Sequence, residues 1–349
     1  GPYLDLIPKE IKVIEASGLL RILGTSKEEA KKLGFFYYLL RGFCILLSKV
    51  FFNHLPINIL VSLHKKIGNY DIAISYLQNA REHIFYGGCN EFVLKRIESK
   101  KKITFCHCDF IRSEVNTKRN REIYRQFDTI VGVSEGCKKT IVEAMPDIEN
   151  KTYAIRNFHN YDEYEMLSNL DTVQYDHNYL NIVTVARISS EKGLLRTVDV
   201  VKKLSVEGYK IKWHVIGDGP EKKALELKIK QLDLEENILL YGNQINPYRF
   251  IKNADIFLLP SFHEAAPMVI DEAKSLGVPV ITTETISARE MVKSYHEGLV
   301  CENSKKGIYE GLKVVLDHSD YLVQWKKNLQ EKIFSNEWEL NKLEKLLGE

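Results

Sequence analysis

Short apolar segments alternate with helical patterns along almost the whole chain, and this alternation limits the fold more than any other feature of the sequence. Amphipathic stretches such as 192–204, 221–232 and 308–318 separate the apolar segments. Strands that alternate with helices form parallel sheets covered by helices, so we predict an α/β protein. The segments that we interpret as strands are residues 11–14, 72–75, 102–108, 129–134, 152–155, 181–186, 212–217, 238–242, 256–261, 279–283 and 298–302.

These strands are too many for one comfortable sheet, and 349 residues exceed a usual single domain. We therefore predict two doubly wound domains, an N-terminal one over 1–165 and a C-terminal one over 166–334. A helix over 335–349 is expected to return to the first domain. Open parallel sheets bind ligands beyond the carboxyl ends of their strands, so the site should be a cleft between the two domains.

Charge is distributed unevenly along the chain. The net charge is only +2, which argues against a nucleic-acid partner. Residues 1–160 hold 25 Lys and Arg against 17 Asp and Glu, and the remainder holds 24 against 30. A basic front half suggests an anionic partner there. The six cysteines include no Cys-x-x-Cys pair, so we expect reduced thiols in a cytoplasmic protein, and no metal site.

Two strand ends in the back half have features that suit phosphate groups. Arg187 and Lys192 follow strand 181–186 on one short loop, where they would grip a diphosphate as a planar fork and a point charge. After strand 212–217, Gly217 and Gly219 allow close approach of a ligand to the backbone. Taken singly, the first segment is better explained as an ordinary solvated loop, and the second is equally consistent with a capped turn.

The segment "PSFHEAAPMVIDEAKSLGVPVITT", residues 260–283, places two glutamates eight positions apart. Pro267 suits the first turn of a helix that runs to about residue 276, and the first amides of a helix bind anions. Glu264 precedes that helix and Glu272 lies inside it, so the two carboxylates would contact separate parts of one extended ligand. The backbone groups expected at the helix start are those of Ala266, Met268 and Val269.

Together these strand ends fit a nucleotide diphosphate sugar. Cations and the helix N-terminus would hold the phosphates, while one glutamate would bind the ribose and the other the sugar. Two unrelated glutamates would explain their spacing alone, but not the whole set of strand ends.

The back half resembles the retaining GT-B glycosyltransferases of family 4, the glycosyl transferases group 1, of the kind that makes bacterial surface polysaccharides. The residues that carry this resemblance are "VARISSEKG", "VIGDGPE", "YGNQINPYRFIKNADIFLLPS" and "HEAAPMVIDEAKSLGVPVITT". The resemblance is specific over 181–302 and looser over 70–160. It departs from the family at Ala265, where glycine is common.

The resemblance implies two Rossmann-like domains that face each other across a cleft, and sugar transfer with retained anomeric configuration. Arg187, Lys192 and Glu264 match the family's catalytic residues, and Glu272 matches its second motif glutamate. His107 matches the front-domain histidine that approaches the donor sugar, with a partly buried strand-end histidine as the alternative. Contacts near Gly217 and Asn243 usually select the base, with uridine as a family-level expectation. No metal and no cofactor are implied.

Residues 31–70 contain six Lys and Arg and no Asp or Glu. Phe36, Leu40, Phe43, Leu47 and Val50 follow helical spacing, so we expect them to face a core. Cations in the middle of the segment disfavour a membrane span, since each costs about 2.5–3.5 kcal/mol at the bilayer centre. The segment instead fits peripheral contact with the inner face of the plasma membrane, and an acceptor that is a saccharide or a lipid-linked saccharide. A core helix with basic flanks is the alternative.

Enzymes of this family begin with a strand and a glycine-rich loop, and nothing before Tyr3 resembles either. The N-terminal domain is therefore expected to lack its first βα unit, which another segment or another chain would supply. Two other functions stay open: a sugar-nucleotide epimerase of the same fold, and a non-catalytic subunit or fragment that binds nucleotide sugar. Ser134 and Glu135, at another front-domain strand end, are weaker candidates for contact with the acceptor.

Overall fold

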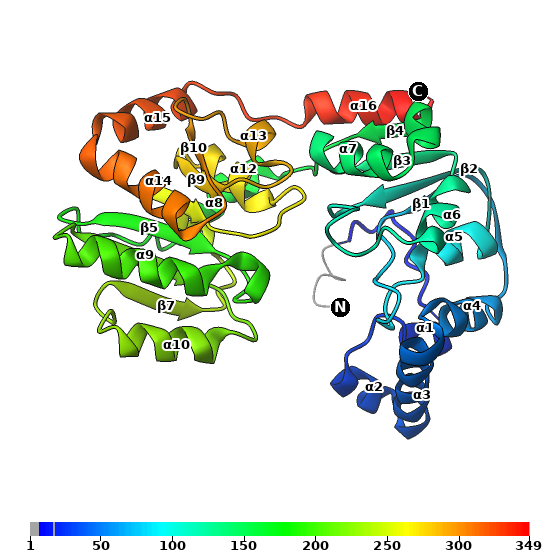
Figure 1. Ribbon diagram of the computed structural model, residues 1–349. Helices are drawn as coiled ribbons and strands as arrows, with labels where there is room; N and C mark the ends of the chain where they lie inside the picture. The colour runs from blue at the N-terminus through cyan, green and yellow to red at the C-terminus, as the bar shows by residue number, and fades with distance from the viewer. Residues whose placement is uncertain (1–6, 17, 349) are drawn as a thin grey trace. The chain divides into compact units, whose positions relative to one another are not determined.

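The computed structural model describes residues 7–16 and 18–348 and contains two parallel sheets (Figure 1). The front sheet has the order β1-β2-β3-β4, with strands Ile67–Ser75, Ile97–Cys106, Thr129–Gly132 and Thr152–Ala154. The back sheet has the order β10-β9-β8-β5-β6-β7, with β5 at Leu180–Val185, β6 at Ile211–Ile216, β7 at Ile238–Gly242, β8 at Ile256–Leu259, β9 at Val280–Thr283 and β10 at Gly298–Cys301. The α/β prediction is confirmed.

One predicted strand is wrong. Residues 11–14 join neither sheet, and Ile11, Val13 and Ile14 stay about half exposed. An apolar run becomes a strand only where a neighbouring strand and a core bury it, and this segment has neither among the described residues. The segment before Tyr3, where we expected a first βα unit to be missing, lies outside the described residues.

The helices that precede and accompany the front sheet are α1 Gly18–Arg21, α2 Lys27–Leu33, α3 Phe35–Phe51, α4 His54–Ser62, α5 Cys89–Arg96, α6 Lys118–Arg125, α7 Glu135–Ala144 and the 3₁₀-helix η2 Pro146–Lys151. Those of the remaining chain are α8 Tyr161–Ser168, the 3₁₀-helix η3 Ser190–Lys192, α9 Leu194–Val206, α10 Lys222–Gln231, α11 Tyr248–Ile251, α12 Met268–Ser275, α13 Ala288–Met291, α14 Lys305–Asp317, α15 Asp320–Gln330 and α16 Glu337–Leu347.

The chain forms two compact units, each assembled from separate segments. The front unit contains the residues up to 106 together with 110–131 and 144–152. The back unit contains 107–109, 132–143 and the chain from 153 onward. The turn after β3 and most of α7 therefore pack with the back sheet's part of the molecule.

Helices cover both faces of the back sheet, as a doubly wound fold requires. On one face α9, α10 and α14 pack through Val198, Leu225 and Leu312 against a core that includes Trp213. On the other face α8, α11 and α12 contribute a second core around Phe257. The inner strands β8 and β9 are buried at every position, which explains why their sequences are almost entirely apolar.

Only part of the face of α3 that we predicted to be buried is covered: Leu40 packs against a core and Leu47 is partly buried. Phe36, Phe43 and Val50 are 64%, 57% and 61% exposed, and the buried residues of α3 are Cys44 and Ser48.

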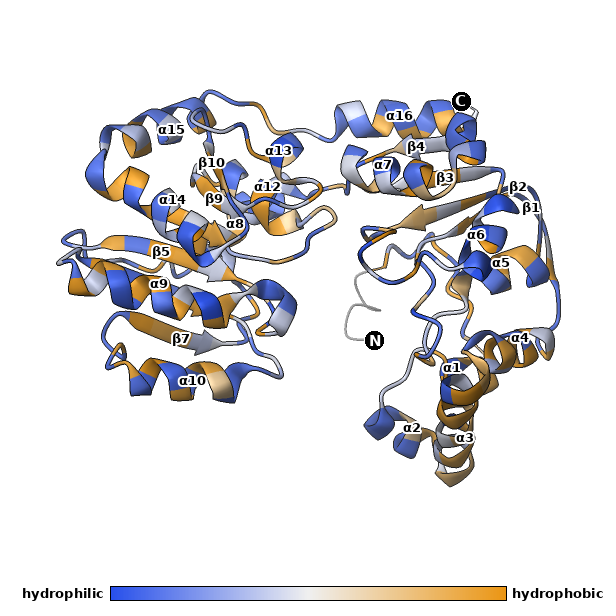
Figure 2. Ribbon diagram, viewed as in Figure 1, coloured by the Kyte–Doolittle hydropathy of each residue, from blue (hydrophilic) through white to orange (hydrophobic). Residues whose placement is uncertain are grey.

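α3 instead packs through Leu40, Cys44 and Ile45 on a small core that it shares with α4. Arg41 Nε also donates a hydrogen bond to the carbonyl oxygen of Thr25 at 2.9 Å. Figure 2 shows α3 and α4 as strongly apolar ribbons.

A buried carboxylate is one of the contacts that anchor the C-terminal helix α16. Glu339, 5% exposed, accepts hydrogen bonds from the Arg156 backbone N and from Arg156 Nε at 3.0 and 3.2 Å. Lys342 Nζ donates to the carbonyl oxygen of Ala154, the last residue of β4, at 3.3 Å. The helix expected near the C-terminus is therefore present.

We expect Glu339→Gln to loosen α16, because a neutral amide cannot replace a buried carboxylate that accepts from a guanidinium. The free energy that holds this helix should fall by about 1–3 kcal/mol, seen as faster hydrogen–deuterium exchange of residues 337–347. Glu337→Gln, an exposed change on the same helix, is the control. Equal exchange in the two variants would contradict this account.

Candidate donor-binding site

The predicted donor residues of the back half all lie beyond carboxyl ends of strands in the back sheet. Arg187 comes two residues after β5, Gly217 directly after β6 and Asn243 directly after β7. Glu264 lies in the loop after β8, before α12. Because the strands are parallel, these ends share one edge of the sheet, and Arg187 and Asn243 are exposed there.

The loop after β5 packs directly on the end of β8. Gly193 has a left-handed backbone (φ 68°), and a Cβ placed on it would lie 2.2 Å from the carbonyl oxygen of Pro260. The amide of Phe262 also donates to the carbonyl oxygen of Glu191 at 2.8 Å. Only glycine permits this approach, so the "EKG" part of the motif positions its lysine over the β8 loop.

Lys192, Glu264 and Ser261 form a compact polar cluster. Lys192 Nζ lies 2.6 Å from Glu264 Oε1, and Ser261 Oγ donates to the same oxygen at 2.6 Å. The Glu264 side chain is only 10% exposed, so its ion pair with Lys192 is shielded from water. The sequence predicted both charged residues for the site, and the structure brings them into contact.

Arg196 contacts the end of β8 beside this cluster and was not predicted from the sequence. Its Nη2 donates to the carbonyl oxygen of Pro260 at 2.8 Å and to Asn303 Oδ1 at 2.6 Å. The guanidinium lies 3.8 Å from the centre of the Phe262 ring. Burial lowers the pKa of Arg196. The available signal was an arginine on the apolar face of helix 192–204.

The turn after β6 also needs glycine. Gly217 has φ 140°, and an added Cβ would lie 1.9 Å from the carbonyl oxygen of Ala186. The amide of Gly217 donates to the carbonyl oxygen of Gly242, and that of Ile188 to Asp218. The ends of β5, β6 and β7 are thus tied together by backbone contacts, which leaves their loops at fixed positions.

Helix α12 begins at Met268, and the extended Pro267 precedes it without a side-chain cap. The amides of Met268 and Val269 therefore start the helix at this edge of the sheet, as predicted. The loop before it is anchored by its carbonyl groups. Ser134 Oγ donates to Ala265 O at 2.7 Å, and Asn157 Nδ2 donates to Ala266 O at 3.3 Å.

Ser134 and its neighbour thus have structural contacts. Ser134 Oγ also accepts a hydrogen bond from the amide of Cys137 at 3.0 Å, near the start of α7. The amides of Glu135 and Gly136 donate to the Glu290 carboxylate at 3.0 and 3.3 Å. These contacts fix the start of α7 against the back sheet's part of the molecule.

Glu272 occupies a half-buried position inside α12. Burial, with a smaller effect of Asp271, raises the pKa of its carboxyl to about 7. Tyr164 and Tyr248 lie near enough for Glu272 to add to the rise that burial causes in their own pKa values. Their rings stack with centres 4.8 Å apart. These tyrosines were not predicted, because contacts between distant segments leave no local sequence pattern.

His107 follows Cys106, the last residue of β2. It is partly buried, and burial lowers its pKa, which favours the neutral imidazole at pH 7. It is grouped with the back unit together with residues 108 and 109. Its approach to a donor sugar stays a prediction.

Residues 172–332 match the model of the family described as glycosyl transferases group 1. One curated relative is the putative colanic acid biosynthesis glycosyltransferase WcaL of Escherichia coli K12, 30% identical over 167 residues. That alignment covers 44% of this chain and 40% of the relative. The chain thus spans about two fifths of the length of the curated relatives it matches.

Two solved structures share the fold. A glycosyltransferase from Rickettsia africae ESF-5 superposes with a TM-score of 0.63 at 16% identity, over 95% of this chain and 94% of that one. Anabaena Alr3699/HepE in complex with UDP superposes with a TM-score of 0.62 at 17% identity, over 71% and 72%. The two-sheet α/β fold is therefore GT-B, as the sequence predicted.

The raised pKa of Glu272 makes stability depend on pH. Its carboxyl has an ordinary pKa of 4.5 and a pKa of about 7 in the folded chain. Between these two pH values the folded chain therefore binds more protons than the unfolded chain. The free energy of unfolding should therefore fall as pH rises through this range, by on the order of 2 kcal/mol. Glu272→Gln removes the ionisation. The free energy of unfolding of this variant, relative to that of the wild type, should therefore be higher at pH 8 than at pH 5.

Urea unfolding of both proteins at the two pH values tests this. Glu226→Gln, an exposed change on α10, is the control and should show no such gain. A difference between Glu272→Gln and the wild type that does not vary with pH would show that Glu272 ionises normally.

Proposed function

We propose that the protein is a retaining, metal-independent glycosyltransferase that moves a sugar from a UDP-sugar to a saccharide or lipid-linked acceptor in polysaccharide synthesis. The observation that carries the proposal is the cluster of Lys192, Glu264 and Ser261 at the carboxyl edge of the back sheet, in the loop that leads to α12. A cation, a shielded carboxylate and free helix amides suit a sugar diphosphate better than an uncharged ligand.

Each donor residue has a role that its position supports. Exposed Arg187 and the neighbouring Lys192 bind the diphosphate, together with the first amides of α12. Glu272 accepts hydrogen bonds from the ribose hydroxyls, and Glu264 from those of the sugar. Binding of the diphosphate supplies Lys192 with a second anion, so its ion pair with Glu264 orients the lysine before the donor arrives.

In the reaction, the bond between the anomeric carbon and the diphosphate oxygen breaks, and a bond to the acceptor oxygen forms on the same face. The departing diphosphate takes the acceptor's proton. Arg187, Lys192 and the α12 amides stabilise the negative charge that develops on the leaving group, which lowers the barrier. His107 approaches the donor sugar in this proposal as a neutral hydrogen-bonding group.

Two similarities support the finer parts of the proposal. HepE was solved with UDP, which favours uridine as the base here. The name of WcaL refers to biosynthesis of a polysaccharide, colanic acid, which favours a saccharide acceptor.

A thermal-shift panel of UDP- and GDP-sugars tests the donor site. We expect one UDP-sugar near saturation to raise the melting temperature by about 5 °C, because a ligand that binds only the folded state stabilises it. Glu272→Ala and Lys192→Ala should each abolish most of this rise. Glu226→Ala, on the exposed side of α10, should retain it.

The outcomes separate the candidate functions. A shift with turnover only in the presence of an acceptor supports the transferase. Conversion of the sugar nucleotide in a donor-only incubation would identify an epimerase, and binding without turnover until another chain is added would identify a non-catalytic subunit. No shift with any nucleotide sugar would overturn the donor site.

The outer face of α3 and α4 gives the acceptor side a membrane contact in this proposal. Large apolar side chains are about half exposed or more along it: Phe35, Phe36, Leu39, Phe43, Leu46, Val50, Phe51, Ile59 and Leu63. The flanking charges of residues 31–70 are all basic. Such a face suits the interface of an anionic bilayer on the cytoplasmic side. In the described part of the chain, no helix is long and apolar enough to cross a membrane.

Flotation with phosphatidylglycerol–phosphatidylcholine vesicles tests the membrane contact. We expect binding that weakens as salt rises, and at least about tenfold weaker binding for Phe43→Ser, because a buried aromatic side chain contributes about 1.5–3 kcal/mol. Leu227→Ser removes an equally exposed apolar side chain from α10 and should bind like the wild type. Equal loss in both variants would contradict a specific face.

A further inference from the structure

Arg196 is a buried cation that forms no ion pair within the described part of the chain. The residue is 8% exposed, and its guanidinium donates hydrogen bonds to the neutral oxygens of Pro260, Ser261 and Asn303. Cys301 is the ionisable group that acts on it, but burial raises the pKa of this thiol to about 12, so the thiol is neutral at pH 7. A buried charge that no carboxylate balances is costly, and it attracts an anion that comes near.

The guanidinium fixes the segment that leads to Glu264. Arg196 Nη2 donates to the carbonyl oxygens of Pro260 and Ser261 at 2.8 and 3.3 Å. The guanidinium also lies 3.8 Å from the centre of the Phe262 ring. Ser261 Oγ in turn donates to Glu264 Oε1 at 2.6 Å. The position of the Glu264 carboxylate therefore depends on Arg196 through the backbone at the end of β8.

The same guanidinium lies beside the loop of Lys192. A Cβ placed on Gly193 would lie 2.9 Å from Arg196 Nε, and this nitrogen has no hydrogen-bond partner among the described residues. Lys192 is already paired with Glu264, so the pair adds little net charge to the site. The positive charge that is not cancelled at this edge of the sheet therefore comes from Arg196 and the exposed Arg187.

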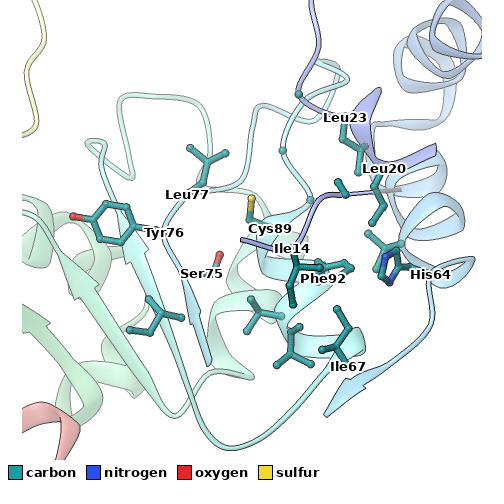
Figure 3. A pocket seen from close by; sticks show the side chains of 18 of the residues that line it. Ile14, Leu20, Leu23, His64, Ile67, Ser75, Tyr76, Leu77, Cys89 and Phe92 are labelled. Carbon is teal, nitrogen blue, oxygen red and sulfur yellow. The ribbon is translucent and has the colours of Figure 1, made fainter. Parts of the chain in front are cut away.

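The large cavity of the front unit offers an anion no comparable charge. Its volume is about 530 Å³, and apolar side chains such as Leu20, Leu23 and Phe92 line it (Figure 3). Among the described residues of its lining there is no lysine or arginine, and Glu15 adds a negative charge. A diphosphate is therefore attracted to the carboxyl edge of the back sheet rather than to this cavity.

We propose that Arg196 is a positioning residue for the donor diphosphate, which it attracts through the two loops that it holds together. This inference rests on the proposed function, because it takes a nucleotide diphosphate sugar as the donor. Arg196 does not touch the ligand. Its field reaches the phosphates because a buried charge is weakly screened by water and salt. The same field stabilises the diphosphate as it leaves the sugar.

Calorimetric titration with UDP and with uridine tests this role, because uridine has the same base and ribose but no charge. If the thermal-shift panel selects another base, the corresponding nucleoside diphosphate and nucleoside take their place. We expect Arg196→Gln to weaken UDP binding at least about tenfold and uridine binding less than about twofold, because only the diphosphate interacts with the lost charge. Arg196→Lys keeps the charge and should bind UDP within about threefold of the wild type.

Lys203→Gln is the control, since it removes a positive charge from the exposed end of the same helix. It should bind both ligands like the wild type. Melting temperatures without ligand show whether each variant folds. If Arg196→Gln does not fold, Arg196→Lys decides: an unchanged ratio of UDP to uridine affinity supports the proposal, and a ratio lower by about tenfold overturns it.

The outcomes separate this inference from the proposed function. Equal weakening of UDP and uridine in Arg196→Gln would show a purely structural role and overturn this inference alone. The same follows if Arg196→Lys binds UDP as weakly as Arg196→Gln. A wild-type protein that binds no nucleoside diphosphate would overturn the proposed donor site and this inference with it.

Discussion

The contact between the loop after β5 and the end of β8 determines the geometry of the candidate site. Gly193 lies against the Pro260 carbonyl at a distance that no side chain would allow, and Arg196 ties the same carbonyl to Asn303. Lys192 and Glu264 are brought together by this contact although they are far apart in the chain. Backbone packing thus holds the two charged groups close together, which lowers the entropy cost of ordering them.

The two glutamates of the motif differ in their surroundings. Glu264 is ion-paired and hydrogen-bonded, whereas Glu272 is half buried beside two tyrosines and has a raised pKa. Two identical side chains in one short motif therefore have different surroundings. This difference fits contacts with different parts of one extended ligand.

Much of the fold was predictable, because inner parallel strands such as β8 and β9 read as unbroken apolar runs and their ends coincide with polar loops. The start of α12 was predictable from Pro267. The strand over 11–14 failed because strand formation needs a partner strand. The prediction for α3 failed at Phe36, Phe43 and Val50 because this helix meets its neighbours through Leu40 and Cys44. Tyr164, Tyr248 and Arg196 were missed in the site, since their roles depend on contacts with distant segments that one sequence does not encode locally.

The loop between β8 and α12 is held by residues that precede it by more than a hundred positions. Ser134 and Asn157 bind the carbonyl oxygens of Ala265 and Ala266 from two other segments of the back unit. A piece of chain that begins after these residues would contain the whole glutamate motif yet lack the supports of its loop. The motif therefore does not form its loop conformation independently. Recombination between related chains would preserve the loop only where the exchanged piece includes Ser134 and Asn157, or where the recipient chain has equivalent hydrogen-bond donors.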